Sequence, residues 1–167
     1  MAPDRSIATP CMNESSDLFS LDTNLLIYAI DGQAGIRHQL AKLIIEHAVS
    51  SNCCLTLQAV SEFYYAVTRE GVLPREEAAA QADDWLRLFV CVAASASSVR
   101  TALTDAADGR ASYWDALLVA TAREAGCAVM LTEDLADGTD FGGVQIHNPF
   151  SPTGGLTPLA RRLLGME

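Results

Sequence analysis

The chain has 167 residues, of which 50% are apolar and 19% are charged, so it is long and apolar enough to form a single domain with its own core. This composition excludes a disordered or collagen-like chain. With 11 basic and 21 acidic residues the formal net charge is −10, which argues against a non-specific nucleic-acid coat because an acidic surface repels phosphates. It leaves open a nuclease whose acidic residues gather a divalent metal ion.

The cysteines and the N-terminal segment indicate a reducing compartment. The five cysteines are an odd number, and no two of them have the C-x-x-C spacing of a zinc or redox site. Residues 1–17 lack the apolar region of a secretory signal, and the chain has no run of about 18 apolar residues. We therefore expect a cytoplasmic protein without a membrane span.

The first half of the chain alternates short apolar runs with helical patterns. Residues 1–17 are polar and are expected to form a flexible N-terminal arm. The patterns then predict a strand at 18–21, helical turns at 25–30, an amphipathic helix at 34–50, a strand at 53–57 and a helix at 58–70. The apolar stripe expected of the helix at 34–50 consists of Ile36, Leu40, Leu43, Ile44 and His47 or Ala48.

The second half continues the alternation. Pro74 is expected at the first position of a helix that runs to about residue 89. The next predicted elements are a strand at 90–93, helices at 97–107 and 112–124, a strand at 127–131, and a strand at 144–147 opened by Gly142 and Gly143. In the tail, 151–167, Thr157 and Pro158 predict the start of a short helix that either packs on the body, binds a partner or is loosely held.

Apolar strands separated by helices are typical of a parallel sheet that is covered on both faces. We therefore expect an α/β fold with three layers, α/β/α, around a central, mostly parallel sheet that spans residues 18–150. Sites in such folds form beyond the carboxyl ends of the strands.

Four carboxylates stand alone in apolar stretches of the sequence. Asp22 and Asp134 each follow an apolar strand, Asp115 lies in the first turn of a helix, and Glu62 is the only charge within 53–68. Acidic side chains are rarely buried unless they are paired or bind a metal. Each also has an ordinary structural interpretation: Asp22 and Asp134 as caps, Asp115 in a capping box with Ser112, and Glu62 on an exposed helix face.

Strand ends and helix starts in a parallel sheet share one edge, so the four carboxylates are expected to meet there. Their mutual repulsion needs relief by protonation or by a divalent cation. Oxygen ligands without a convincing set of histidines and cysteines favour Mg²⁺ or Mn²⁺ over zinc. Such a site supports phosphodiester hydrolysis, because the metal activates water and stabilises charge on the transferring phosphate.

Several short motifs resemble those of the PIN-domain ribonucleases, in particular the VapC-like toxins of type II toxin–antitoxin systems. The opening motif is LDTNLLIYA at 21–29, and the fourth is LTEDL at 131–135. The others, in the expected order, are SEF at 61–63, YWDALLVATA at 113–122, GC at 126–127 and NPF at 148–150. Together they cover about residues 18–150, and the tail after Phe150 lies outside the pattern.

The resemblance implies a Mg²⁺- or Mn²⁺-dependent endoribonuclease that forms homodimers and is blocked by a cognate antitoxin. The metal-site positions of the family fall on Asp22, Glu62, Asp115 and Asp134. Three further residues match supporting positions. Asn24 and Thr132 correspond to residues that orient the carboxylates or water, and Asp137 corresponds to an additional acid.

RNA has to reach an acidic site on an acidic protein, so cationic and aromatic side chains could help to bind it. Arg37 and Arg110 are candidates to guide the strand because each lies near a predicted loop at a strand end or helix start. Aromatic rings could stack on bases, although their helical spacing beside apolar residues favours core packing. The rings in question are those of Tyr28, Tyr64, Tyr65, Tyr113 and Trp114.

Two other functions remain to be compared with the nuclease hypothesis. A catalytically silent PIN-like module that binds RNA or protein would keep the pocket without turnover. A phosphatase with an aspartate nucleophile is disfavoured because such enzymes resemble an Asp-x-Asp start, and the second position here is Asn24.

Overall fold

A computed structural model describes residues 17–166 of the chain. The segment 1–16, which includes most of the predicted arm, lies outside the described residues, as does Glu167. No helix within 17–166 is long and apolar enough to cross a membrane.

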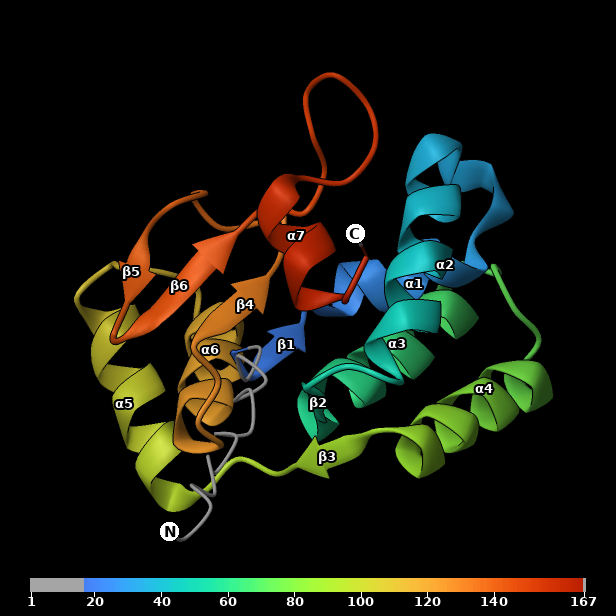
Figure 1. The fold of residues 1–167 in the computed structure, drawn as a ribbon. Coiled ribbons are helices and arrows are strands. Elements are labelled where there is room, and N and C mark those ends of the chain that lie inside the picture. Colours follow the sequence, from blue (N-terminus) through green and yellow to red (C-terminus); the bar gives the residue numbers. More distant parts are fainter. Residues whose placement is uncertain (1–16, 167) are drawn as a thin grey trace, which may run out of the picture.

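The elements alternate between strands and helices (Figure 1). In chain order they are β1 (Phe19–Leu21), α1 (Thr23–Ile30), the 3₁₀ turn η1 (Gly32–Ala34), α2 (Ile36–Ala48), β2 (Cys53–Thr56), α3 (Leu57–Arg69), α4 (Arg75–Leu88), β3 (Val90–Val92), α5 (Ala96–Ala107), α6 (Tyr113–Glu124), β4 (Val129–Leu131), β5 (Asp140–Phe141), β6 (Val144–His147) and α7 (Pro158–Leu163).

The strands form one six-stranded sheet in the order β3-β2-β1-β4-β6-β5. All neighbouring pairs are parallel except β5 and β6. Figure 1 shows α5 and α6 on one side of this sheet and α1, α3 and α7 on the other. The predicted α/β fold with three layers and a mostly parallel sheet is therefore confirmed.

The core lies where the central strands meet the flanking helices. The strand residues Phe19, Leu21, Leu55, Met130 and Ile146 are fully buried. Residues of β1 and β4 are buried without alternation, which is the pattern of strands covered on both faces. These two strands lie at the middle of the sheet. Polar residues follow each of them at its carboxyl end, where the chain emerges from the core.

The structure corrects the predicted helix at 34–50. Gly35 has a φ of 62°, a backbone conformation that favours glycine, and it separates η1 from α2. The predicted apolar stripe is also wrong in part, because Ile36 is exposed while Ala41, Ile44 and Ala48 form the buried face. Similarly, Pro74 is the N-cap of α4 and does not occupy its first helical position.

The antiparallel edge of the sheet, formed by β5 and β6, was not predicted from the sequence. Gly142 and Gly143, expected only to open a strand, connect β5 to β6 as a two-residue turn with φ values of 66° and 94°. Two positive φ values are typical of the hairpin turns that match the twist of antiparallel strands. With two residues, β5 is too short to show a periodic pattern.

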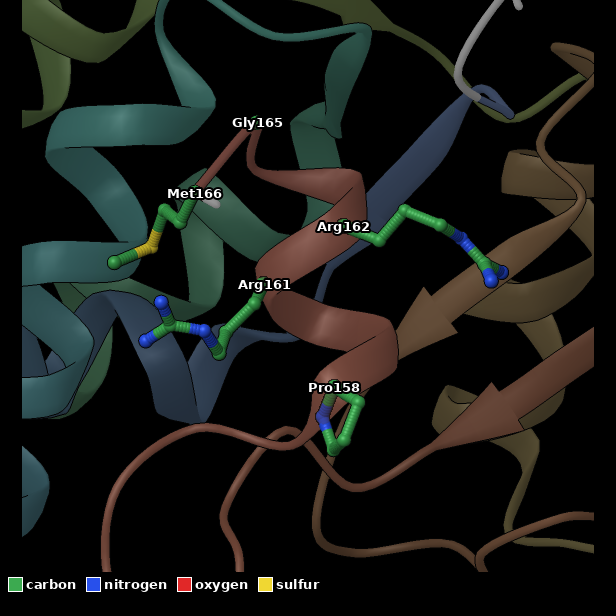
Figure 2. A pocket seen from close by; sticks show the side chains of 5 residues that line it. All are labelled: Pro158, Arg161, Arg162, Gly165 and Met166. Carbon is green, nitrogen blue, oxygen red and sulfur yellow. The ribbon is translucent and has the colours of Figure 1, made fainter.

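The tail is part of the body of the protein. Thr157 caps α7 with its hydroxyl on the Ala160 N–H, as predicted, and Pro158 is the first helical residue. Leu163 and Leu164 are buried in the main core, so the tail is not the loosely held end considered above. Figure 2 shows that Arg161 and Arg162 point away from each other on α7, and both line a surface hollow.

Candidate active site

Asp22 lies directly after β1 and is the N-cap of α1. One carboxylate oxygen accepts a hydrogen bond from the Thr23 N–H at 2.6 Å, and the other accepts one from the Thr132 hydroxyl at 2.7 Å. The side chain is nearly buried, with 7% of the residue exposed. The carboxylate that the sequence places at a strand end therefore serves as a cap and also sits beneath the surface of a cleft.

Burial raises the pKa of Asp22 to about 6. The hydrogen bond from Thr132 acts in the opposite direction, and the negative charges of Asp134 and Asp115 raise the pKa further. Asp22 is thus held among like charges in a poorly solvated place.

Glu62 is anchored by two neighbours on different helices. The Thr23 hydroxyl donates to one of its carboxylate oxygens at 2.9 Å, and the Gln58 side-chain amide donates to the other at 2.9 Å. The same amide nitrogen also donates to the carbonyl oxygen of Trp114 at 2.9 Å. Gln58 therefore connects Glu62 on α3 with the first turn of α6. Glu62 is half-buried and lines the cleft.

Asp115 lies in the first turn of α6 and forms the predicted contact with Ser112. Its N–H donates to the Ser112 hydroxyl at 3.2 Å, and that hydroxyl donates to the Asp115 carboxylate at 2.6 Å. This is the predicted cap at the start of α6. Asp115 also lines the same cleft as Asp22.

Asp134 follows β4 and forms hydrogen bonds with two residues that the sequence suggested as supports. Its N–H donates to the Thr132 hydroxyl at 3.1 Å, and the Asn24 amide donates to its carboxylate. Burial raises its pKa, as do the charges of Asp115 and Glu133, whereas the Asn24 hydrogen bond lowers it. Thr132 thus donates to Asp22 and accepts from the backbone of Asp134, which ties the two strand ends together.

All four carboxylates line one cleft of about 340 Å³. The cleft is also lined by Thr23, Asn24, Ile27, Tyr65, Ala66, Arg69 and Glu70, and by no histidine or cysteine. Within residues 17–166, no three His, Cys, Asp or Glu side chains are grouped closely enough to hold a metal ion together. Each carboxylate is instead oriented by its own hydroxyl or amide donor.

Asp137 does not line the cleft. Its carboxylate accepts a hydrogen bond from the Asn148 N–H at 2.8 Å and lies 3.2 Å from His147 Nδ1. These contacts connect the segment after β4 to the end of β6. In this structure Asp137 therefore supports the loop and stands apart from the other acids.

The two arginines proposed as RNA guides are engaged elsewhere. Arg37 forms a two-pronged ion pair with Glu133, with distances of 2.9 and 2.7 Å to one carboxylate oxygen, and lies over the ring of Phe150. Arg110 pairs with Asp105 at 3.2 Å. Two charged residues of the cleft were not predicted from the sequence: Arg69, the last residue of α3, and Glu70, its C-cap. Their helical spacing of seven and eight residues from Glu62 could have indicated that they lie on the same side.

The model of the PIN domain family matches residues 20–136, which is most of the chain and includes all four carboxylates. No curated protein matches the chain in sequence.

Several solved structures have a similar fold. Mycobacterium tuberculosis VapC20, a toxin that cleaves the sarcin–ricin loop, is 19% identical, with a TM-score of 0.56 over 70% of this chain and 91% of its own. The Rickettsia felis VapBC2 complex bound to promoter DNA is 15% identical, with a TM-score of 0.57, and a Klebsiella pneumoniae toxin–antitoxin complex is 21% identical, with a TM-score of 0.56. Both matches cover 78% of this chain and 97% of the other. From the family match, the chain belongs to the PIN-domain family.

Proposed function

We propose that this protein is an endoribonuclease that depends on Mg²⁺ or Mn²⁺ and acts as the toxin of a toxin–antitoxin pair. The observation that carries the proposal is the single cleft to which four separate segments each contribute a carboxylate: Asp22, Glu62, Asp115 and Asp134. The membership in the PIN-domain family and the likeness in fold to VapC20 support the same activity.

The donor set of the cleft fits a hard divalent cation. Its acidic residues offer carboxylate oxygens, and no imidazole or thiol lines the same space to favour zinc. We assign Asp22, Glu62, Asp115 and Asp134 as the residues that would hold the metal. Because no three of them form a close group in the structure, binding would require these side chains to move closer together. A bound metal would supply an activated water and would stabilise the charge that develops on the phosphate.

The chain itself supplies orientation. Thr132 and Thr23 hold the two oxygens of Asp22, while Thr23 and Gln58 hold those of Glu62. Ser112 and Asn24 donate to Asp115 and Asp134, respectively. These neutral donors leave the negative charges of the cleft uncompensated, so the attraction for a cation is retained.

Cleavage of RNA by the purified chain tests the proposal. With Mg²⁺ or Mn²⁺ the chain is expected to cut RNA, and EDTA is expected to stop it. Asp22→Asn and Asp115→Asn should abolish cleavage, whereas Asp84→Asn, which removes one exposed carboxylate from α4 outside the cleft, should not. Activity that survives the first two substitutions would overturn the assignment.

The alternative is a catalytically silent PIN-like module that binds RNA or protein. One observation favours this alternative. Within 17–166 the four acids share a cleft, but no three of them lie close enough together to hold a metal ion. Calorimetric titration with Mn²⁺ separates the two functions. We expect binding that Asp22→Asn weakens, and a chain that binds no divalent ion would favour the silent module.

An antitoxin partner and a homodimer belong to the same proposal. The Rickettsia and Klebsiella structures are toxin–antitoxin complexes, which supports a protein partner for this chain. An arginine from the partner could enter the cleft and pair with its carboxylates. Co-expression with the neighbouring small open reading frame should yield a complex on pull-down, and light scattering should give the mass of a dimer for the toxin alone. A soluble, non-toxic monomer recovered without a partner would contradict both.

A further inference from the structure

One side of α3 extends the cleft beyond the carboxylates. Four residues after Glu62 follow it at helical spacing, by three, four, seven and eight positions: Tyr65, Ala66, Arg69 and Glu70. This spacing places them on the same side as Glu62, and all five residues line the cleft. Seven residues correspond to about 10 Å along a helix axis. Arg69 therefore lies well away from the acids, towards the end of the same cleft.

Arg69 is a cation without an acidic partner. Arg37, Arg87 and Arg110 each form an ion pair with a carboxylate, whereas Arg69 forms none with any residue of 17–166. Its guanidinium carbon lies 5.8 Å from the centre of the Tyr65 ring. In a chain with a net charge of −10, an arginine without an ion pair at the far end of the cleft is the feature of this cleft that attracts an anion.

Tyr65 presents an aromatic ring to solvent in the same place. The residue is 63% exposed, while the preceding Tyr64 is 38% exposed and does not line the cleft. Ile27 and Ala66 add apolar surface to the cleft. An exposed ring next to apolar surface and a cation is the combination on which bases of single-stranded nucleic acids stack.

We propose that Tyr65 and Arg69 form a nucleotide-binding subsite of this cleft. The Tyr65 ring stacks on a base of single-stranded RNA, and the Arg69 guanidinium binds the phosphate of that nucleotide, which neighbours the one at the carboxylates. The subsite rests on the proposed nuclease function for the identity of its ligand. It supplies the positive charge and the stacking surface that Arg37 and Arg110, engaged in ion pairs, do not.

The first test measures binding separately from cleavage. The probe is a fluorescein-labelled single-stranded RNA of mixed sequence, and its affinity for the full chain is measured by fluorescence anisotropy in EDTA. Tyr65→Ala is expected to raise the Kd roughly 5- to 150-fold, the range measured for loss of one base–aromatic stack. Tyr65→Phe keeps the ring and should bind like the original chain. Tyr64→Ala removes a neighbouring ring outside the cleft and should also leave the Kd unchanged.

The second test concerns the phosphate contact. Arg69→Ala is expected to weaken binding and to reduce the slope of log affinity against log salt concentration by about 0.7, the value for one phosphate contact on a single strand. Arg69→Lys should preserve the slope. Arg100→Ala, which removes an exposed arginine from α5, should change neither quantity because α5 contributes no residue to the cleft.

The outcomes separate this inference from the nuclease proposal. If the chain cleaves RNA but Tyr65→Ala and Arg69→Ala bind the probe as the original chain does, the subsite is overturned and the nuclease stands. If the chain does not cleave but binding depends on both residues, the nuclease fails and the subsite stands. A chain that does not bind the probe at all also overturns the subsite. Thermal unfolding of the Tyr65 and Arg69 variants serves as the control. Unfolding temperatures equal to that of the original chain would show that folded proteins are being compared.

Discussion

Glu133 and Asp134 are adjacent in the sequence but belong to two different regions of the molecule. Glu133 accepts a hydrogen bond from Tyr28 and pairs with Arg37, which in turn lies over Phe150. Asp134 faces the cleft; its carboxylate accepts a hydrogen bond from the neutral Asn24 amide, and its N–H donates to the Thr132 hydroxyl. One carboxylate is neutralised by the fold, and its neighbour is left charged beside other acids.

The partners of Glu133 and Asp134 indicate how a structural acid can be distinguished from a functional one. A carboxylate with a cationic partner adds to stability, so its removal should destabilise the protein. A carboxylate that lies among like charges, with only hydroxyls and amides as partners, lowers the free energy of unfolding. Such destabilising groups are typical of sites that bind a ligand. The following predictions test this division.

The largest expected effect is on cleavage. Asp22→Asn keeps the shape and a capping side chain but removes the charge, so kcat with Mn²⁺ should fall by more than about 100-fold, the upper loss seen for residues that only support metal ligands. Initial rates on RNA measure this. Equal rates for Asp22→Asn and the control Asp84→Asn would contradict the division.

The same substitution should stabilise the metal-free protein at neutral pH. The folded-state pKa of Asp22 is raised from 3.8 to about 6, so the folded protein binds its proton more tightly than the unfolded chain does. Stability of the original chain is therefore lost as pH rises from about 4 to about 6, by at most about 3 kcal/mol for a shift of this size.

Thermal unfolding in EDTA checks the sign of this effect. Asp22→Asn should unfold at a higher temperature than the original chain near pH 7, and the gap should close below about pH 3, where the folded and the unfolded states of the original chain both carry the proton. Added Mg²⁺ should also narrow the gap, because it stabilises only the folded chain that retains the carboxylate. A variant less stable than the original chain at neutral pH would show that Asp22 is a structural acid.

Glu133→Gln should give the opposite result. It removes the negative charge that faces Arg37, whose ion pair is partly exposed, so we expect a loss of about 1–2 kcal/mol in the free energy of unfolding. Cleavage per folded molecule should stay within about threefold of the original, since Glu133 does not line the cleft. Urea unfolding and initial rates on the same preparation measure both. A large loss of activity at unchanged stability would place Glu133 with the functional acids.

The smallest expected effect concerns the cap of α6. Ser112→Ala removes the hydroxyl that accepts from the Asp115 N–H and donates to its carboxylate. Loss of an N-cap of this kind costs about 1 kcal/mol. Ser112→Asp restores a capping oxygen but places a second carboxylate next to Asp115, so it should recover less stability than Ser112→Thr does. Equal recovery by both would show that the charge in the cleft is not felt at this position.

Much of the fold could be predicted from the sequence because its signals are local. Ser112 before the apolar turn and Gly126 after it mark the ends of α6, and the run at 129–131 marks a strand buried on both faces. The antiparallel edge formed by β5 could not be predicted, because two residues carry no periodicity. Nor could the buried face of α2, since it depends on which side of the helix meets α1.

The acidic character of the cleft could be predicted from residue type and position, because four isolated carboxylates follow strands or lie near helix starts. Which charges have an ionic partner could not be predicted without the three-dimensional structure. Arg37 forms an ion pair with Glu133, and Asp137 contacts His147 and the Asn148 N–H. Arg69 lies over the Tyr65 ring and forms no ion pair with any residue of 17–166. The physical reason is that a charge is neutralised by neighbours in space, and these come from segments far apart along the chain.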